Sequence, residues 1–532
     1  MQPADKKAKY DFDIDQQDLN GAKDGDMALG EIQPSRGARN KKIRILEVIG
    51  RRDDPKAISL LSMHGVGIRP DFTDKVLNST KSMTVPKQGK REDLTGIPLV
   101  TIDGADARDF DDAVFAEESE DGFHLIVAIA DVAFYVRPET PLDVEAYRRG
   151  NSTYFPDRVV PMLPEALSND LCSLRPKENR ACLAVHMWID AAGHLKRHKF
   201  VRGIMRSAAR LTYEQAQAVY DGHFSPLEKG GDQEGCGDAL PDIISPLYAA
   251  YAVLEKARKK RGALDLDLPE RKIDLDENNN MIGVSPRVRL DSHKLIEEFM
   301  VLANVAAASE LEKRKAPCVY RVHEPPALEK LDSARDFIKT FGLSMPKGQA
   351  VKPGDLNQIL GKAADHPYKH LINEVILRSQ SQANYSPENK GHYGLALTRY
   401  SHFTSPIRRY ADLIVHRALI RACGLGEGGL DEGEEARLAE ICDHISTTER
   451  ISMEAERNAV DRFTASFLSD KVGATFEGRI KGATRFGLFV ELHETGADGF
   501  IPMRMLPDDY YVHDEEHHML IGRHTGKVYR MG

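Results

Sequence analysis

Three stretches of the chain differ in how hydrophobic and polar residues are spaced. Residues 10–71 carry short alternating or β-branched runs separated by turns, and these predict strands, most clearly in YDFDI, DGDMALGEI and KKIRILEVIG. Residues 97–419 mix predicted strands and helices without the regular alternation of a doubly wound sheet. From residue 472 the spacing again favours strands, in TFEGRI, FGLFVEL and DGFIPM. The pattern therefore predicts a mixed central region between two β-rich flanks.

Within the central region, LVTID and FHLIVAIADVAFYV are predicted strands because they are apolar and rich in β-branched residues. Residues 212–222 open with Thr212 and Gln215 at the spacing of a capping box, which predicts a helix. Residues 293–315 repeat apolar positions at helical spacing and predict a long amphipathic helix. A further helix is expected in DLIVHRALIRAC, and loops are expected over 225–241 and 424–435.

The length of 532 residues is too great for one hydrophobic core and predicts several domains. The polar segment VPKQGKREDLTG (85–96) is typical of a linker. We therefore expect an α+β multidomain protein, divided into a partial β-barrel over 1–75, a linker over 76–96, a mixed domain with C-terminal helices over 97–470, and a second partial β-barrel over 471–532.

The composition is that of a globular protein, with 41% hydrophobic and 29% charged residues. No apolar run reaches the ~18 residues that span a bilayer. The longest candidate, residues 125–136, contains Asp131 and predicts a buried strand, and the first residues lack the apolar core of a signal peptide. The six cysteines form no CxxC pair, which argues against zinc and disulfides and fits a reducing compartment. We expect a cytoplasmic protein with no membrane partner.

The net charge of −9 argues against nucleic-acid binding driven by overall charge, because such binding relies on cationic surface. Local basic patches and metal ions would have to supply the attraction. Gly424, Gly426 and Gly429 have the GxGxxG spacing, but a predicted helix precedes them and acidic residues follow, so we reject a dinucleotide site. The sequence contains no P-loop, HExxH or GxSxG signature.

Residues 101–113, TIDGADARDFDDA, crowd five aspartates between two predicted strands: Asp103, Asp106, Asp109, Asp111 and Asp112. So many carboxylates cannot all stay ionised in a buried site without cations. Magnesium prefers oxygen ligands and takes one or two carboxylates together with water and phosphate, and paired magnesium ions support phosphoryl displacement. A solvated acidic loop or a structural calcium site remains the alternative, although the spacing does not fit an EF-hand.

Arg408 and Arg409 follow a Thr-Ser-Pro turn at the start of the predicted helix in YSHFTSPIRRYADLIVHR. A helix N-terminus attracts phosphate through its unpaired N–H groups, and arginine adds a bidentate fork. Hydroxyls and rings suited to RNA lie beside them, namely Thr404, Ser405, Tyr400, His402, Phe403 and Tyr410. The alternative is a surface helix whose arginines are simply solvated.

Tyr154 and Phe155 lie between arginines in RRGNSTYFPDRVVPMLPEALSNDLCSL. Exposed rings beside arginine suit single-stranded nucleic acid, where stacking contributes ~1–3 kcal/mol per base. Core packing is the more common role for such a pair of residues. One of the two rings is therefore expected to be buried.

Together these patches resemble the RNase II/RNB superfamily, and within it the bacterial ribonuclease R group. The resemblance covers roughly residues 95–470, and its motifs are TIDGADARDFDDA, VAIADVAFYVRP, RGNSTYFPDRVVPMLPEALSNDLCSLRP, HKLIEEFMVLANVAAA and HFTSPIRRYADLIVHR. It implies a mixed α/β RNB catalytic domain. It also implies an enzyme that threads single-stranded RNA and hydrolyses it processively from the 3′ end to nucleoside 5′-monophosphates.

The same resemblance implies roles for residues at matching positions. Those that match the metal ligands are Asp103, Asp109, Asp111 and Asp112, without Asp106. Asp111 matches the aspartate on which the chemistry depends most, and Tyr154 matches the aromatic residue that clamps the terminal nucleotide. Arg408 matches the arginine that grips the scissile phosphate, and Arg409 is expected to contact RNA beside it. Glu456 lies where the family has a glutamate near the end of the RNA path.

The flanks resemble the family's RNA-binding modules, a cold-shock-type barrel at the N-terminal end and an S1-type OB-fold at the C-terminal end. In the second, three phenylalanines among basic residues predict a stacking platform, although at least one is expected to fill the barrel core. They are Phe476, Phe486 and Phe489, among Arg479, Lys481 and Arg485. Both barrels look incomplete and a lysine-rich tail is absent, so we expect a chain truncated at both ends.

The expected protein is thus a magnesium-dependent exoribonuclease, with manganese as the alternative metal. It is expected to be a monomer that acts on single-stranded RNA and on RNA with 3′ overhangs. The ribonuclease R resemblance implies action on structured RNA, but duplex unwinding and association with ribosomes or RNA-decay factors stay open. Two rivals remain, a non-catalytic RNA-binding protein on the same scaffold and a metal-dependent endonuclease or DNA exonuclease.

Overall fold

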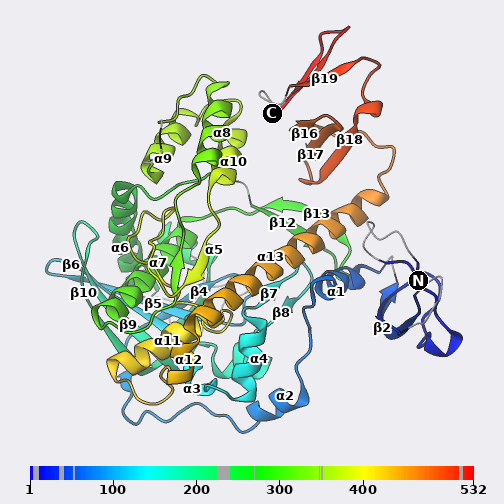
Figure 1. Cartoon of the computed structure of the whole chain (residues 1–532). Coiled ribbons are helices and arrows are strands. Elements are labelled where there is room, and N and C mark those ends of the chain that lie inside the picture. The colour runs from blue at the N-terminus through cyan, green and yellow to red at the C-terminus, as the bar shows by residue number, and fades with distance from the viewer. Residues whose placement is uncertain are drawn as a thin grey trace.

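The computed structural model describes residues 1–3, 11–34, 41–51, 54–223, 240–268, 270–346, 348, 351–514 and 519–531. Along this part of the chain, a small N-terminal β unit is followed by a large α/β domain and then by a C-terminal β unit at the end of a long helix (Figure 1). Of the helices that the structure describes, none has both the length and the apolar character that crossing a membrane requires.

The N-terminal unit is built on one antiparallel hairpin. Its elements are the 3-10 turn η1 (Gln16–Asp18) and the strands β1 (Asp26–Ile32) and β2 (Ile43–Arg51). The strands expected in DGDMALGEI and KKIRILEVIG are confirmed. In YDFDI, Tyr10 lies outside the described residues, and Asp13 makes a single bridge to Lys42 in place of a strand.

Two helices follow where only strands and a linker were expected. They are α1 (Pro55–Val66) and α2 (Asp74–Thr80). Asp54 caps α1 by accepting the Lys56 N–H, and Gly67 ends it in the left-handed conformation. Helix α1 was not predicted, because the short alternating runs of residues 10–71 indicated strands and the capping residues Asp54 and Gly67 were given no weight.

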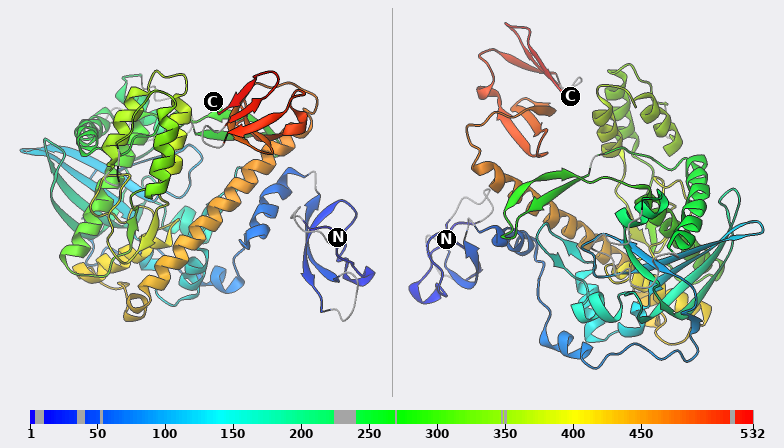
Figure 2. Two further views of the ribbon diagram at one scale, coloured as in Figure 1. Left: turned by 45° about the horizontal axis from the view of Figure 1, so that its top comes forward. Right: turned by 180° about the vertical axis from the view of Figure 1, so that it is seen from behind.

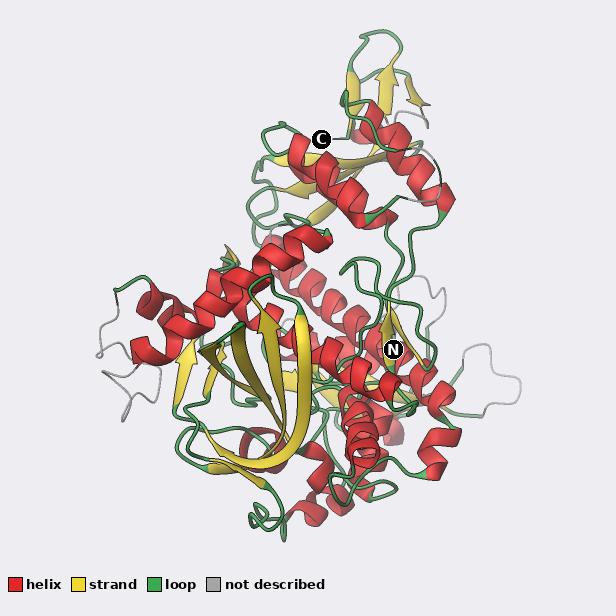
Figure 3. Cartoon of the chain, turned by 90° about the vertical axis from the view of Figure 1, so that its left-hand side faces the viewer, coloured by secondary structure: helices red, strands yellow, loops and turns green. Residues whose placement is uncertain are grey.

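A seven-stranded sheet in the order β11-β4-β5-β6-β9-β10-β3 is the centre of the molecule (Figure 3). Its strands are β3 (Glu92–Leu94), β4 (Val100–Asp103), β5 (Asp112–Ser119), β6 (Gly122–Ala130), β9 (Asn179–Asp190), β10 (Leu195–Arg206) and β11 (Ala209–Thr212). The middle strands pair antiparallel, whereas β11 and β3 pair parallel at the edges. The segment expected as a linker therefore supplies an edge strand.

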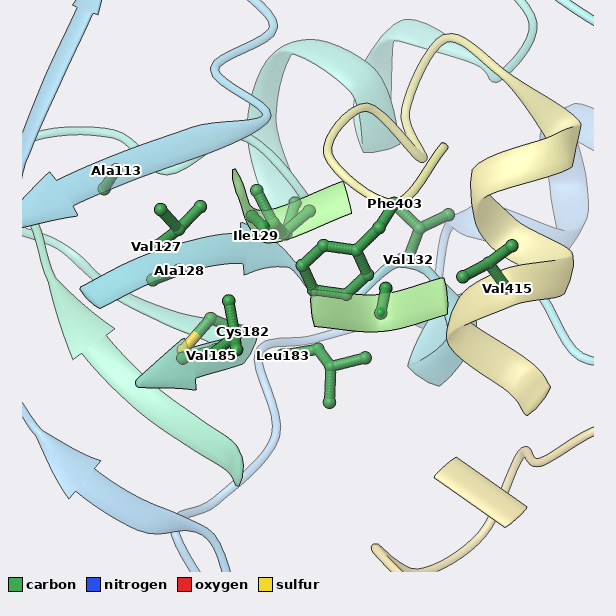
Figure 4. Close-up of a cluster of buried hydrophobic side chains, with 14 of the residues drawn as sticks. Ala113, Val127, Ala128, Ile129, Val132, Cys182, Leu183, Val185, Phe403 and Val415 are labelled. Carbon is green, nitrogen blue, oxygen red and sulfur yellow. The ribbon is translucent and has the colours of Figure 1, made fainter. Parts of the chain in front are cut away.

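Helices pack against this sheet because its middle strands are apolar on both faces. Residues 125–130 of β6 are at most 1% exposed. These helices are α5 (Tyr213–Tyr220), α6 (Leu240–Arg261) and α7 (Asp291–Lys313), and α11 (Tyr410–Cys423) packs on α7. Helices α5, α7 and α11 confirm the three helices predicted from spacing. Phe403 lies among Ile129, Val132 and Val415 in this core (Figure 4). The loop that precedes α11 is thereby anchored in the core.

Strand β6 ends at Ala130, earlier than expected, and the chain turns into α3 (Val132–Tyr135). The reason is Asp131, whose buried Oδ2 accepts hydrogen bonds from Arg91 Nη2 and Arg202 Nε, both at 2.6 Å. Burial opposes ionisation of this carboxyl group, but the two guanidinium groups outweigh it and hold its pKa below the usual range. A buried carboxylate needs such partners, and the local pattern of the chain does not show them.

The remaining elements of the central domain lie around the sheet. They are α4 (Pro141–Arg149), β7 (Thr153–Tyr154), β8 (Val159–Val160), the π-helical turn η2 (Ala166–Leu171), β12 (Arg271–Leu275), β13 (Met281–Pro286), β14 (Tyr320–Val322), α8 (Leu328–Lys339), α9 (Pro353–Lys362), α10 (Lys369–Ser379) and β15 (Asn384–Ser386). Within the loop expected over 424–435, α12 (Glu432–Ala436) begins. Of the other expected loop, 225–241, residues 225–239 lie outside the described residues.

The long helix α13 (Leu438–Ser469) crosses the central domain, packs on α1 and leads to the C-terminal unit (Figure 2). That unit holds two three-stranded sheets. Their strands are β16 (Gly478–Thr484), β17 (Gly487–Leu492), β18 (Asp498–Pro502), β19 (Tyr511–Asp514), β20 (Met519–Gly522) and β21 (Val528–Arg530), with the 3-10 turn η3 (Met503–Met505) between the sheets. The strand expected in TFEGRI begins only at Gly478. Strands β19 to β21 were not predicted.

Candidate active site

The acidic loop joins the end of β4 to the start of β5, two interior strands of the central sheet. Its aspartates line a cavity of about 1980 Å³ together with Tyr154 and Arg408. Asp103 is the last residue of β4 and Asp112 the first of β5, so the sheet places both ends of the loop. Asp106 also lines the cavity, but it is exposed.

Hydrogen bonds hold this loop from behind. The Phe110 N–H donates to Ser173 Oγ at 3.1 Å, and the Ser173 hydroxyl donates to Arg108 O at 2.8 Å. Arg210, on β11, donates from Nη2 to Ala105 O at 2.9 Å and lies 3.4 Å from two further loop carbonyls, those of Gly104 and Ala107. One guanidinium group thus clamps three carbonyls of the acidic loop. Sequence reasoning did not find it, because nothing local marks Arg210.

Asp111 is the most buried of the aspartates, at 5% exposure. Its Oδ1 accepts the backbone N–H of Ile407 at 2.9 Å, and its Oδ2 lies 3.9 Å from Arg408 Nε. Oδ2 is buried and has no hydrogen-bond partner within the described part of the chain. Burial raises the pKa of Asp111 well above its usual range, although the Arg408 charge opposes the shift.

The other three predicted ligands also have raised pKa values. Burial, reinforced by the Asp103 charge, raises the pKa of Asp112 to about 7. Burial likewise raises the pKa of Asp103 and Asp109. The loop therefore holds more buried negative charge than its surroundings neutralise, and a bound cation would relieve it.

The donor set of the loop fits a hard divalent cation, because every candidate ligand atom is a carboxylate oxygen. Among the residues that the structure describes, no three His, Cys, Asp or Glu side chains converge closely enough to hold one ion. Magnesium usually takes one or two carboxylates and completes its shell with water and substrate phosphate. The partnerless Oδ2 of Asp111 fits such a partial protein shell.

The two neighbouring arginines before α11 have different surroundings. The side chain of Arg408 is 42% exposed and donates from Nη2 to Ser405 Oγ at 3.0 Å. Arg409 donates from Nε and Nη2 to the two carboxylate oxygens of Asp412, both at 2.8 Å. Because Arg409 is paired with Asp412, a contact of Arg409 with RNA stays a prediction. Arg408 is the better placed of the two to bind phosphate.

Tyr154 lies on β7 and is 41% exposed at the cavity. Its backbone N–H donates to Oε1 of Glu456, on α13, at 2.7 Å. Phe155 is only 7% exposed and packs in the cluster with Met63, which confirms that one of the two rings is buried. Glu456 thus supports Tyr154 through its backbone.

The Tyr154 segment is also tied to the arginine loop. The Ser152 N–H donates to Arg408 O at 3.0 Å, and the Tyr410 N–H donates to Gly150 O at 2.9 Å. A side chain at position 150 would overlap Thr448, and Gly150 has a φ of 72°. The aromatic and cationic parts of the site are therefore one rigid unit.

In the C-terminal unit, Phe486 and Phe489 are 64% and 47% exposed. Arg485 lies over the Phe486 ring at 4.7 Å from its centroid. Phe500, which the sequence reasoning missed, lies beside Phe489 with ring centroids 5.0 Å apart and is 44% exposed. Phe476 is half-buried outside the strands and does not belong to the small core. The expectation that one of the three phenylalanines fills the core is wrong.

Another aromatic pair was also missed. Tyr213 and His293 are stacked at the cavity wall, with ring centroids 3.9 Å apart and an interplanar angle of 15°. They belong to the starts of two different helices, α5 and α7. The sequence predicted both helices, but it gave no sign that these two rings stack on each other.

Comparisons with known proteins match three family models along the chain. The RNB domain matches residues 91–424, the cold shock domain residues 1–73, and the S1 RNA binding domain residues 469–529. The chain is 39% identical over 546 residues to ribonuclease R of Vibrio cholerae serotype O1, covering 100% of this chain and 66% of that protein. It spans 64% to 66% of the length of the first three curated relatives it matches.

Solved structures show the same similarity. RNase R of Mycoplasma genitalium in complex with ribose methylated single-stranded RNA has a TM-score of 0.92 and 30% identity, and the match covers 98% of this chain and 82% of that one. The same organism's RNase R in complex with double-stranded RNA has a TM-score of 0.84 and 29% identity, and the match covers 93% of this chain and 88% of that one.

Proposed function

This chain belongs to the RNB family, and from that premise we propose that it is a processive 3′→5′ exoribonuclease that hydrolyses RNA to nucleoside 5′-monophosphates with the help of magnesium. The RNB match over residues 91–424 covers more than half of the chain. Relatives and solved structures of similar sequence are named as ribonuclease R, and the structures contain RNA.

The observation that carries the proposal is the relation of Asp111 to Arg408. Leaving a buried carboxylate oxygen without a donor costs free energy, and Oδ2 of Asp111 is such an atom within the described residues. A cation beside it would remove that cost. The Arg408 guanidinium, 3.9 Å away and partly exposed, is suited to a phosphate oxygen. A cation site next to a phosphate site is the arrangement used in metal-assisted phosphodiester hydrolysis.

We assign the other steps to the chain's own residues. Tyr154 would stack on the terminal base, with ~1–3 kcal/mol per stacked base, and Glu456 would hold Tyr154 through its N–H. Arg408 would neutralise the charge that develops on the scissile phosphate, an electrostatic contribution that is often the largest in such reactions. Because Tyr154 and Arg408 belong to one rigid unit, the cut would fall one nucleotide from the end.

The metal ligands in this proposal are Asp103, Asp109, Asp111 and Asp112. A pair of magnesium ions, or manganese in their place, would supply an activated water and neutralise charge at the phosphate. The chain would give up protons from these carboxyl groups when it binds the metal, because their pKa values are raised without it. Arg210 would keep the loop in place while this happens.

For the whole chain, we propose single-stranded RNA and RNA with 3′ overhangs as substrates, a monomeric state and a cytoplasmic location. The proposed division remains 1–75, 76–96, 97–470 and 471–532. The flanking units would deliver RNA to the cavity, with Phe476, Phe486 and Phe489 as stacking residues and Arg409 as a further contact.

The test is incubation with magnesium, with and without EDTA, of a single-stranded oligoribonucleotide that is labelled in its 3′-terminal nucleotide. We expect mononucleotides released from the 3′ end, and none with EDTA. Asp111→Asn should abolish hydrolysis and leave RNA binding intact. Asp106→Asn is the matched control, because Asp106 lies in the same loop but is exposed. Equal loss of binding and hydrolysis in Asp111→Asn would contradict the assignment.

The same assay separates the rivals. Binding without any product would identify a non-catalytic RNA-binding protein, and internal fragments would identify an endonuclease. A DNA oligonucleotide of the same sequence tests for DNA exonuclease activity. A duplex with a 3′ overhang then shows whether structured RNA is degraded.

A further inference from the structure

The hairpin of β12 and β13 lies between the central domain and the C-terminal unit (Figure 2). On one side it packs on helices α1 and α13 through an apolar cluster of Ile58, Met281 and Phe463, joined by Ile273 and Val284. The hairpin is therefore fixed to the rigid part of the molecule. Its first residue, Arg271, extends to the C-terminal unit.

Arg271 reaches a carboxylate that is buried in the C-terminal unit. Its Nη2 lies 3.4 Å from Glu491 Oε1, and the same carboxylate receives Arg479 Nη2 at 3.3 Å and Lys481 Nζ at 2.7 Å. The Glu491 side chain is only 10% exposed. Burial opposes its charge, but these cations outweigh burial and hold its pKa below the usual range. Glu491 is thus a fixed negative charge to which Arg271 is bound.

Arg271 also lies directly against the backbone of a loop in the C-terminal unit. A Cβ built on Gly496 would come within 1.6 Å of Arg271 Nη1, and Gly496 has a φ of 68°. A side chain at this position would therefore push the guanidinium away. Residues 495–498 of this loop and residues 270–273 of the hairpin line the same cavity as the acidic loop. The contact joins two parts of one cavity wall.

We propose that Arg271 is a latch that holds the C-terminal unit against the hairpin, so that residues 495–498 complete the wall of the RNA cavity. This inference rests on the proposed function. RNA long enough to reach the C-terminal unit binds more tightly because it is held at two sites at once, and this increase in affinity depends on how the two sites are placed relative to each other. Without the latch, the C-terminal unit moves relative to the central domain at the end of α13, and the increase in affinity becomes smaller. A short RNA whose contacts are confined to the acidic loop, Tyr154 and Arg408 does not need the latch.

Two substitutions test this, Arg271→Gln and Glu491→Gln. Breaking a partly exposed ion pair costs up to about 1 kcal/mol, or roughly fivefold in binding. We expect both variants to bind long RNA about fivefold more weakly and to degrade it less processively. Turnover and affinity for a short RNA whose contacts are confined to the acidic loop, Tyr154 and Arg408 should stay unchanged. Glu491→Gln distinguishes the latch from a direct contact with RNA. If Glu491 faced the RNA directly, removing its negative charge would strengthen RNA binding.

The matched control is Glu494→Gln. Glu494 carries the same charge in the same unit, but it is exposed, does not line the cavity, and makes no ion pair among those of the described residues. It should therefore leave the difference between long and short RNA as in the wild type. Small-angle scattering without RNA gives a second readout. The radius of gyration should increase in Arg271→Gln and Glu491→Gln, and not in Glu494→Gln.

The outcomes distinguish this inference from the proposed function. If the wild-type protein degrades neither RNA, the proposed function fails, and scattering alone decides whether the latch exists. If the wild-type protein degrades both, equal losses on long and short RNA in Arg271→Gln would overturn the latch and make Arg271 a direct contact. Unchanged or tighter binding of long RNA by Glu491→Gln, or an unchanged radius of gyration, would overturn it as well.

Discussion

Asp111 and Ile407 are 296 positions apart in the sequence, yet Oδ1 of the first accepts the backbone N–H of the second at 2.9 Å. This bond joins the acidic loop to the loop that carries Arg408. One oxygen of the carboxylate is used to hold the arginine loop, and the other is left for a ligand. The Asp111 side chain therefore fixes the separation between the predicted metal ligands and Arg408, the predicted phosphate ligand.

Arg210→Ala should lower kcat by about tenfold or more, because a shift of the reacting groups by ~1 Å has effects of that order or larger. Its guanidinium holds carbonyls of the acidic loop and does not line the cavity. KM for RNA should change little, and the magnesium concentration for half-maximal activity should rise. Steady-state kinetics at several magnesium concentrations measure both effects.

Arg210→Lys should recover part of the activity, since an ammonium group can replace one of the carbonyl contacts. Arg206→Ala, which removes an arginine at the end of β10, is the control. A loss of RNA affinity in Arg210→Ala as large as the loss of kcat would contradict a positioning role.

Tyr154→Ala should weaken binding of the RNA 3′ end by ~1–3 kcal/mol, the contribution of one stacked base. It should also change the length of the shortest product, because the terminal nucleotide loses its clamp. Tyr154→Phe keeps the ring and should behave almost as the wild type. Gel analysis of the end products decides this, and identical end products for Tyr154→Ala and the wild type would exclude the clamp.

Gly150→Ala should destabilise the protein by about 2–4 kcal/mol. A left-handed backbone costs alanine ~1 kcal/mol, and overpacking adds ~1–3 kcal/mol, since the new Cβ would lie 1.9 Å from Thr448 Oγ1. Thermal unfolding measures the loss. Adding Thr448→Ala should restore part of it.

The control for this prediction is Gly65→Ala. Gly65 lies in α1, and an added Cβ there would meet nothing within 4 Å. Alanine also favours helix over glycine by up to ~1 kcal/mol. Destabilisation of Gly65→Ala equal to that of Gly150→Ala would show that the overlap at Thr448 is not the cause.

The contribution of His416 to the stability of the fold should fall as the pH drops from about 6.5 to about 4. His416 is fully buried, and burial lowers its pKa from 6.5 to about 4 although its bond to Phe403 O opposes the shift. Over that interval the unfolded chain binds a proton that the folded chain does not, so unfolding becomes easier as pH falls. The loss from this residue is at most ~3 kcal/mol.

Urea unfolding followed at several pH values tests this. His416→Gln removes the titrating group and should show a smaller decrease between pH 6.5 and pH 4 than the wild type does. His194→Gln, which changes an exposed histidine, should leave the decrease as it is. An equal pH dependence in the wild type and in His416→Gln would contradict the assignment.

The sequence alone was enough to predict the chemistry that we propose for this protein, since the residues proposed to carry it lie in short motifs. The aspartates of TIDGADARDFDDA and the arginines of SPIRRY are close in the chain, and their spacing next to predicted strands and helices marked them. Helices α5, α7 and α11 and strands β4 and β6 also follow from local spacing, whereas helix α6 and strands β9 and β10 were not predicted. Family resemblance then supplied roles that composition does not show, since the net charge of −9 argues against RNA binding.

Only the tertiary structure decided which of these residues are available to a ligand. Arg409 is occupied by Asp412, while Arg408 is partly exposed beside Asp111. Tyr154 is held by Glu456 from 302 positions away, and β6 stops where Asp131 meets arginines from two distant segments. Periodicity reports whether a side chain faces the interior, but it carries no information on which distant partner meets it there. Burial and pairing of charges are therefore properties of the folded chain, and they set the site.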